Sequence, residues 1–313
     1  MKSAVFTFVP PSPNTVIASV RIAEFISMTL DIPLHWDEHV ADHRWDVLFL
    51  VNGAFSYCAH RDDVAIAVRK AKRIIWAQND YVIYAPIPDG TAESTFRKAF
   101  RIRRQKGLPD MDHWTTVKAK AHMTKWSRYI NWNSLTALKS PRSCNRHAED
   151  DLFYYGAFRS SRSRAFDRYF RQKKVPISLS SASKKFALRY PHAQLVPTIP
   201  RGGFYKELNR HGIGLYIEDP RSHREFHSPA NRFYEMLSSG LPMVFEPEAV
   251  TMLGKAGYDI ADYVAEGQRD IRAFLRHRRQ IQRQQSERWW DDFRGQLTHT
   301  LRRSFRRYTE EHF

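Results

Sequence analysis

Cysteine is scarce in this 313-residue chain, which holds only Cys58 and Cys144. Two thiols are too few for a zinc site built from cysteine alone, and such usage suits a reducing, cytoplasmic setting. No run of eighteen apolar residues occurs, so the sequence predicts no transmembrane insertion. The opening segment MKSAVFTFVPPSPN has too short an apolar stretch for a signal peptide and is more typical of a buried first strand.

Acidic residues are also in short supply, with 33 Asp and Glu against 50 Lys and Arg and a net charge of +17. The excess is unevenly placed. Residues 101–147 carry 11 basic and 2 acidic side chains, and residues 267–313 carry 12 and 6. These two segments hold fifteen of the seventeen excess charges. Concentration of this kind favours a polyanionic partner over generic solubility.

What the chain does contain is an alternation of strand-like and helix-like segments. Apolar content of 42% and aromatic content of 13% describe a globular protein long enough for two domains. In the first half, strands are predicted at residues 4–9, 46–51 and 73–77, with helices between them. A second βα series starts near residue 151. This rhythm predicts an α/β protein with parallel sheets and ligands at the carboxyl ends of the strands.

The same pattern predicts the domain organisation. We expect an N-terminal Rossmann-like domain at residues 1–147, with a basic aromatic insertion at residues 96–146. A second Rossmann-like domain is expected at residues 148–266. Residues 267–313 are helical in composition and form a tail. No internal repeat or low-complexity tract is present, and we expect a monomer.

The most specific pattern lies at residues 213–248. An apolar run and a polar loop lead to Ser228 and Pro229, which suit the N-cap and the first position of a helix. Gly240 suits the left-handed end of that helix, and a second apolar run follows at once. The segment therefore predicts a strand–helix–strand unit.

The start of this helix predicts a nucleotide-diphosphate site. A helix that begins between two parallel strands offers free N–H groups to an anion, here from Ser228, Asn231 and Arg232. Glu235, one turn further in, can accept hydrogen bonds from a ribose diol. The alternative is an ordinary βαβ unit in which Glu235 is only solvated.

The string from Asn231 to Pro242, NRFYEMLSSGLP, resembles the donor-binding segment of GT-B glycosyltransferases. In that segment a glutamate, a helix end of small residues and a Gly-x-Pro turn lead into the next strand. The family often has an acidic residue eight positions before the glutamate, where this chain has His227. The resemblance implies two Rossmann-like domains facing a central cleft, a nucleotide-sugar donor with a UDP-sugar favoured, and a C-terminal helix that crosses back towards the first domain.

Other candidates for donor binding lie at strand ends. Arg159 follows the first strand of the second domain and could balance the charge of a leaving diphosphate without a metal, as in metal-independent GT-B enzymes. Ser180, Tyr216 and Glu218 end further strands, where side chains often hold a nucleobase. Each of these residues could instead be an ordinary surface or loop residue. We expect no cofactor beyond the donor and no essential metal.

A transferase that inverts the anomeric centre needs a base to take the proton of the acceptor hydroxyl. Asp80, at the end of a strand in the first domain, fits best by position. Asp37 and His60 are rivals.

Two metal-like patterns carry less weight. Three histidines recur every fourth residue at His35, His39 and His43, but in a stretch that is extended in character, so a solvated surface is the better interpretation. Asp110 and Asp112 copy an Asp-x-Asp metal motif but follow a loop rather than a hydrophobic strand.

The basic segment at residues 96–146 interleaves cations with aromatic side chains. Phosphates attract the cations, and unstacked bases can lie on aromatic faces. The alternative places the aromatic side chains in the core and the cations in water. The residues expected to contact nucleic acid are Arg101, Arg103, Arg104, Lys118, Lys120, Lys125, Trp126 and Arg128.

Together these patterns predict a glycosyltransferase, with DNA as the favoured acceptor. One concrete version resembles viral enzymes that glycosylate hydroxymethylated bases in DNA, and it would work in the host cytoplasm. Two rivals stay open: a transferase acting on a lipid-linked or surface glycan, with the basic helix on an anionic membrane, and a non-catalytic nucleic-acid-binding protein with a transferase-like fold.

Overall fold

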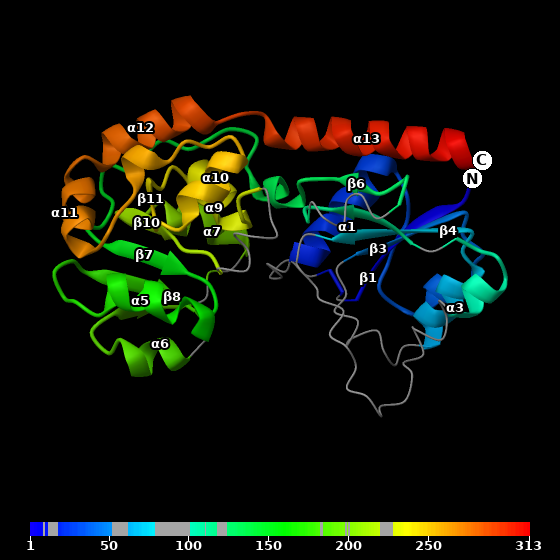
Figure 1. Cartoon of the computed structure of the whole chain (residues 1–313), viewed down its shortest axis with the longest axis horizontal. Helices are drawn as coiled ribbons and strands as arrows, with labels where there is room; N and C mark the ends of the chain where they lie inside the picture. Colours follow the sequence, from blue (N-terminus) through cyan, green and yellow to red (C-terminus); the bar gives the residue numbers. More distant parts are fainter. Residues whose placement is uncertain are drawn as a thin grey trace. The chain divides into compact units, whose positions relative to one another are not determined.

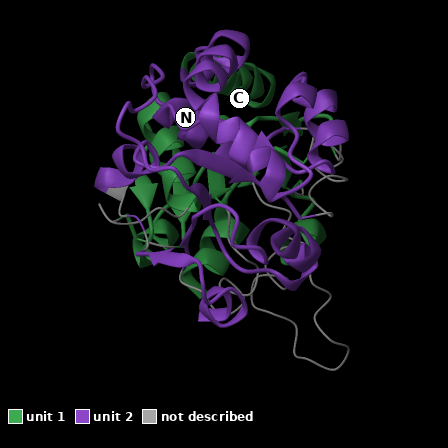
Figure 2. Ribbon diagram, turned by 90° about the vertical axis from the view of Figure 1, so that its left-hand side faces the viewer, with its two compact units in different colours: residues 1–135, 295–313 green, residues 136–294 purple. Residues whose placement is uncertain are grey.

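The structure is a computed structural model of the whole chain (Figure 1). It describes residues 1–8, 10–11, 18–51, 62–78, 101–109, 111–117, 124–181, 184–197, 199, 201–219 and 228–313. Two compact units form, coloured separately in Figure 2. Unit 1 comprises residues 1–135 and 295–313, and unit 2 comprises residues 136–294. Within the described residues, no helix has the length and hydropathy needed to cross a membrane.

Unit 1 is built on a six-stranded parallel sheet with the strand order β2-β1-β3-β4-β5-β6. The strands are β1 (Ser3–Thr7), β2 (Leu34–His35), β3 (Val47–Val51), β4 (Arg73–Gln78), β5 (Asp112–Thr115) and β6 (Arg128–Tyr129). The helices are α1 (Ala18–Leu30), α3 (Asp62–Lys70) and α13 (Phe293–His312). All residues of β1 and β3 are buried, as expected for parallel strands covered on both faces.

Alternation along the strands of unit 1 separates its two cores. Leu48 and Leu50 pack with α3 on one face, whereas Val47, Phe49 and Val51 pack with α1 and α13 on the other. Because side chains alternate across a strand, the continuous apolar run of β3 serves both faces.

Unit 2 is built on a five-stranded parallel sheet with the order β11-β10-β7-β8-β9. Its strands are β7 (Leu152–Tyr155), β8 (Ile177–Ser180), β9 (Gln194–Val196), β10 (Ile213–Tyr216) and β11 (Met243–Phe245). Its helices are α5 (Ser163–Phe170), α6 (Lys184–Arg189), α7 (Phe204–Leu208), α9 (Asn231–Ser239), α10 (Ala249–Lys255), α11 (Gln268–Arg276) and α12 (Arg278–Trp289). In Figure 1, α7, α9 and α10 cover one face of this sheet, and α5 and α6 cover the other.

The basic segment at residues 96–146 is not an insertion, which corrects the prediction. Its described part supplies β5 and β6 to the sheet of unit 1. Trp114 and Trp132 are buried in the core beneath α13, so for these two rings the alternative core interpretation holds. Periodicity missed both strands because they are short, with four and two residues.

The boundary between the units falls at residues 135 and 136, twelve residues before the predicted end of the first domain. The connecting segment bonds to α9 of unit 2: the Leu138 N–H donates to Ser238 Oγ at 3.0 Å, and the Arg142 N–H donates to the Ser238 carbonyl at 2.9 Å. Residues 295–313 belong to unit 1, whereas residues 267–294 stay with unit 2, so the predicted tail is divided.

Candidate functional site

The strand order of unit 2 reverses between β7 and β10. From β7 the chain continues to β8 and β9 on one side, and then returns to build β10 and β11 on the other. In open α/β sheets, ligands bind outside the carboxyl ends of the strands at such a point. Tyr155 and Gly156 lie where β7 ends, Glu218 follows β10, and α9 is the next described helix along the chain.

Gly156 shapes the turn after β7. Its φ of 134° lies in the region that favours glycine. A Cβ atom at this position would lie 3.4 Å from Arg232 Nη2 and 3.4 Å from the Tyr154 hydroxyl. A side chain here would therefore strain the backbone and crowd the guanidinium of Arg232.

Two arginines share one buried carboxylate beside this turn. Glu218 Oε1 lies 3.2 Å from Arg232 Nε, and Glu218 Oε2 lies 3.3 Å from Arg162 Nη2. Arg162 also donates to the Tyr154 hydroxyl, and Arg232 donates to the Ile217 carbonyl at 3.0 Å. The side chains of Arg162 and Glu218 are each 5% exposed. A further buried carboxylate, Glu246, accepts a hydrogen bond of 2.7 Å from the Glu218 N–H, so buried charges of both signs meet beside the turn.

Arg232 keeps its charge in this setting. Burial opposes the charge on its guanidinium, but Glu218 and the Tyr154 ring and hydroxyl outweigh burial and raise the pKa of Arg232. Its guanidinium carbon lies 5.3 Å from the centre of the Tyr154 ring. The arginine is therefore a fixed cation at the switch point.

Glu235 lies one helical turn after Asn231 in α9 and is 5% exposed. The Tyr155 hydroxyl donates a hydrogen bond of 2.9 Å to Glu235 Oε2. Burial first, and then the charge of Glu235, raise the pKa of Tyr155 well above its ordinary value, so the phenol stays protonated and acts as the donor. This bond fixes the carboxylate in a buried position rather than in bulk solvent.

The start of α9 differs from the prediction. Its N-cap is Ala230, which has no capping side chain, so Ser228 is not the cap and Pro229 is not the first helical residue. Ser228 Oγ and Asn231 Oδ1 are buried and have no hydrogen-bond partner within the described part of the chain. Two unpaired acceptors beside the first turn are what a bound ligand with hydroxyl or N–H groups could satisfy. The helix ends as predicted, at Gly240 with a φ of 75°.

Two predicted nucleobase contacts have structural partners instead. The Tyr216 ring is fully buried, and its hydroxyl accepts a hydrogen bond of 2.9 Å from the Ala230 N–H. Ser180 Oγ donates to the Pro197 carbonyl at 3.2 Å. Tyr216 therefore positions the start of α9 and presents no free ring face, and this part of the prediction is wrong.

The sequence favoured Arg159 over Arg162 as the arginine of the site, but the structure buries Arg162 beside Glu218 and leaves Arg159 exposed. Arg159 is exposed and has no ion-pair or hydrogen-bond partner for its guanidinium among the described residues. It lies three residues beyond Gly156, within the same turn. Arg162 is the buried member of the run, and sequence reasoning ranked it below Arg159. Tyr155 was also missed, although its place at the end of a strand was the signal that could have found it.

The structure corrects the prediction that Arg103 contacts nucleic acid. It is fully buried, and its guanidinium donates to the carbonyls of Val68, Ala71, Lys72 and Pro109. The last carbonyls of a helix lack partners within the helix, and Arg103 supplies them for α3. It has no surface to offer a phosphate.

The other residues expected to bind nucleic acid are not buried in this way where the structure describes them. Arg101 and Arg104 are exposed, and Lys118 and Lys120 lie outside the described residues. Lys125 Nζ lies 4.9 Å from the centre of the Trp126 ring, and the Arg128 guanidinium carbon lies 5.8 Å from it. The Trp126 ring also packs edge-on against Tyr308 and His312 of α13, which restricts the ring face available to a base.

Of the three candidates for the acceptor base, the structure describes only Asp37. Asp80 and His60 lie outside the described residues. Asp37 is described and is the N-cap residue of the 3₁₀ turn Glu38–Ala41. Its Oδ1 lies 4.0 Å from His35 Nδ1.

The Asp-x-Asp pattern does not form a metal site within the described residues. Asp110 lies outside the described residues, and Asp112 is buried on β5, where it accepts a hydrogen bond of 2.7 Å from the Tyr308 hydroxyl. Within the described chain, metal-ligand spacing occurs at Glu149, Asp151 and His211. Asp151 Oδ2 lies 2.8 Å from His211 Nδ1, whereas His211 Nε2 is buried and has no hydrogen-bond partner within the described residues.

No protein-family model matches this sequence, and no curated protein is similar to it in sequence. Solved structures do match. T4 phage β-glucosyltransferase in complex with UDP and Mn²⁺ gives a TM-score of 0.65 at 13% identity, over 98% of this chain and 99% of that one. The same enzyme in complex with UDP-glucose gives a TM-score of 0.68 at 14% identity, with the same coverage.

A third solved structure shares the architecture more loosely. AviGT4, a glycosyltransferase involved in avilamycin A biosynthesis, gives a TM-score of 0.50 at 12% identity, over 98% of this chain and 97% of that one. The two parallel sheets with helices on both faces are those of the GT-B fold, and the predicted fold class is confirmed. At such low identity the likeness establishes the fold, and function must be argued from the site.

Proposed function

We propose that this protein is a glycosyltransferase that moves a sugar from a nucleoside-diphosphate sugar to a hydroxyl group, with a hydroxymethylated base in DNA as the acceptor. One observation carries the donor half of the proposal. Arg232, which is mostly buried with its side chain 14% exposed, and the buried Glu235 lie about one turn apart on the helix that follows the switch point of unit 2. A cation and a carboxylate at this spacing suit the diphosphate and the ribose of one nucleotide.

The donor residues divide by chemistry. Arg232, fixed by Glu218, faces the turn at Gly156 and would bind the diphosphate, together with the exposed Arg159. Glu235, oriented by Tyr155, would accept hydrogen bonds from the ribose hydroxyls. A UDP-sugar is the favoured donor, because T4 phage β-glucosyltransferase, which shares the fold, has been solved with UDP-glucose.

The reaction follows from these groups. The acceptor oxygen forms a bond to the anomeric carbon as the bond from that carbon to the diphosphate oxygen breaks. The acceptor proton passes to a base, for which Asp80 remains our candidate, and the nucleoside diphosphate leaves. Negative charge grows on the diphosphate in the transition state, so Arg159 and Arg232 stabilise that state more than the bound donor.

DNA is proposed as the acceptor on the basis of charge. The net charge of +17 and the exposed Arg101, Arg104 and Lys125 provide cations for phosphates. The T4 phage enzyme of the same fold is described as a DNA-modifying enzyme, which supports the same choice.

The decisive experiment is titration calorimetry of Glu235→Ala with UDP-glucose. Loss of two charge-assisted hydrogen bonds should weaken donor binding by roughly 2–4 kcal/mol. Glu248→Ala is a matched control, since Glu248 is an exposed carboxylate of the same unit paired with Arg168. Its donor affinity should equal that of the wild type.

Activity is measured as transfer of labelled glucose to duplex DNA containing 5-hydroxymethylcytosine. Glu235→Ala should be inactive at donor concentrations that saturate the wild type. Unchanged donor affinity in this variant would remove Glu235 from the site and with it the donor assignment. Donor hydrolysis without transfer to DNA would instead overturn only the acceptor.

A further inference from the structure

A second basic site lies at the opposite end of the unit 2 sheet from the proposed donor site. A hollow of about 350 Å³ opens beside the amino-terminal ends of β7 and β8, next to α11. Four cations and one carboxylate line it beside apolar side chains: Lys174, Arg272, Arg276, Arg278 and Asp150. The volume falls at the lower end of the range for small-molecule sites.

Two of the four cations are held in place by the backbone. Arg272 donates to the carbonyl of Lys174, and Arg278 donates to the carbonyl of Ala148 at 3.2 Å and pairs with Asp150. The backbone of Lys174 is itself fixed, because its N–H donates to Gln268 Oε1 at 2.8 Å. Planar guanidinium groups fixed in this way lose little freedom when they bind an anion.

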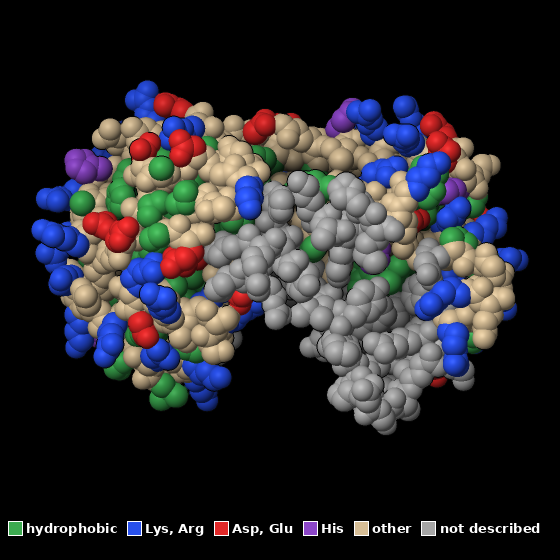
Figure 3. All heavy atoms as spheres, viewed as in Figure 1, with side chains coloured by type: hydrophobic (Ala, Val, Ile, Leu, Met, Phe, Trp, Pro, Cys, Tyr) green, Lys and Arg blue, Asp and Glu red, His purple; other side chains and the backbone are tan. Residues whose placement is uncertain are grey.

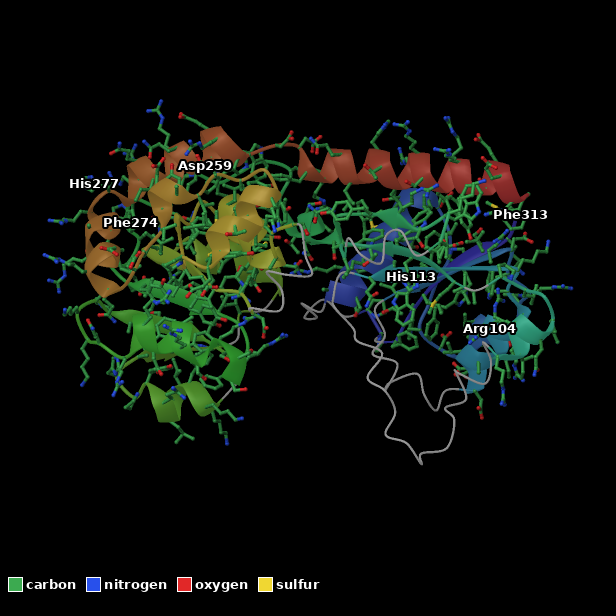
Figure 4. All side chains as sticks on the ribbon, viewed as in Figure 1. Arg104, His113, Asp259, Phe274, His277 and Phe313 are labelled. Carbon is green, nitrogen blue, oxygen red and sulfur yellow. The ribbon has the colours of Figure 1, made fainter. Side chains whose placement is uncertain are left out.

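The other two cations are free to bind. Within the described residues, neither the Lys174 ammonium nor the Arg276 guanidinium has a hydrogen bond or an ion pair. Asp150 is already engaged by Arg278, so the remaining charge of the hollow is strongly positive. Figure 3 shows Lys and Arg side chains gathered along the margin of unit 2 that carries α11, and Figure 4 labels Phe274 and His277 at the end of that helix.

The hollow gathers cations without matching carboxylates. Arg168 and Arg189 of the same unit each pair with a carboxylate, Glu248 and Asp167, whereas Asp150 is the single carboxylate of this lining. Four cations that line one hollow with a single carboxylate repel one another, and an anion bound there offsets that repulsion. Multidentate contact with several cations at once favours a phosphoryl group over a monovalent carboxylate.

We propose that this hollow binds phosphoryl groups, as a second anion site of unit 2 separate from the donor site. Lys174 and Arg276 bind the phosphate oxygens directly, while Arg272 and Arg278 form the fixed wall. The phosphoryl group comes either from a nucleic-acid backbone or from a free phosphorylated molecule. The site does not depend on the proposed transferase activity.

The test is calorimetric titration of the full chain with inorganic tripolyphosphate in low salt, with UDP present to occupy any donor site. The wild type should bind one tripolyphosphate, and the double variant Lys174→Gln/Arg276→Gln should lose at least about tenfold in affinity. The matched control Lys255→Gln/Arg283→Gln removes the same two charges elsewhere in unit 2 and should stay within about twofold. Absence of binding by the wild type, or equal losses in both double variants, overturns the site.

Fluorescence anisotropy with a labelled DNA duplex identifies the source of the phosphate. If the Lys174→Gln/Arg276→Gln variant loses duplex affinity and tripolyphosphate competes with the duplex, the ligand is a nucleic-acid backbone. If duplex binding is unchanged while tripolyphosphate affinity falls, the ligand is a free phosphorylated molecule. An unfolding midpoint (Tm) equal to that of the wild type verifies that the substitutions at these exposed residues leave the fold intact. UDP-glucose titration of the same variants reports separately on the donor site.

Discussion

Arginine side chains of equal charge take opposite roles in this protein, according to what surrounds each one. Arg103 is buried, and its guanidinium donates hydrogen bonds to carbonyls at the end of α3. Arg162 is buried against the Glu218 carboxylate. Arg159 is exposed and unpaired among the described residues, and it alone of these three can reach a ligand without breaking an interaction.

At this scale we predict that Arg103→Met destabilises the protein. The variant removes a charge whose hydrogen bonds satisfy the carbonyls of Val68 and Ala71, and it leaves those carbonyls buried. We expect the free energy of unfolding in urea to fall by roughly 3 kcal/mol. Arg104→Met, in the same helical turn and labelled in Figure 4, should change it by less than about 0.5 kcal/mol, because Arg104 is exposed. Equal effects of the two variants would contradict the structural role of Arg103.

Elements are tied together by a few buried polar contacts. Tyr308 of α13 donates to Asp112 of β5, and burial raises the pKa of this tyrosine, so the phenol stays a donor. In unit 2, Asp151 joins the start of β7 to the start of β10. It accepts from the Gly212 N–H at 2.8 Å and bonds to His211, whose ring stacks on Phe153.

This junction predicts a pH dependence of stability. Burial, the largest single influence, would raise the pKa of Asp151, but the hydrogen bonds with His211, Ser178 and the Gly212 N–H and the charge of His211 together outweigh burial and leave the pKa below its ordinary value. A lowered pKa in the folded state means that the carboxylate stabilises the fold above its unfolded pKa of about 3.9, and that this stability is lost as the pH falls through the folded value. We expect Asp151→Asn to cost about 2–3 kcal/mol near pH 7 and progressively less below about pH 4.

The measurement is urea unfolding of the wild type and Asp151→Asn between pH 7 and pH 3. Asp150→Asn is the adjacent, exposed control. A stability difference that did not shrink on acidification would show that the ionised carboxylate is not what joins β7 to β10.

For the whole molecule, the large positive charge should govern how DNA binding responds to salt. Neutralising Arg101 and Arg104 together should reduce the log–log salt slope by about two, if each contacts one phosphate. Arg103 should not contribute, since it is buried. The slope is measured by anisotropy with duplex DNA between about 50 and 200 mM salt. An unchanged slope would place the nucleic-acid surface elsewhere.

Transfer should not require a divalent cation if arginines alone balance the leaving diphosphate. Turnover in excess EDTA should then equal turnover in buffer, whereas Arg159→Ala should lower kcat by about ten- to a hundredfold. Activity lost in EDTA and restored by Mn²⁺ would contradict this account of the leaving group. It would mean that acidic side chains hold a metal ion at the diphosphate.

Much of this molecule follows from its sequence, because caps, turns and apolar periods act over a few residues. The two βα series, the parallel sheets, the end of α9 at Gly240 and the place of Glu235 in that helix could all be predicted locally. Only the tertiary structure decided which polar side chains are buried together. It assigned Arg103 to the carbonyls of α3, Arg162 to Glu218 and Tyr155 to Glu235, because these partners are 31 to 80 residues apart in the chain and meet only when the sheets form.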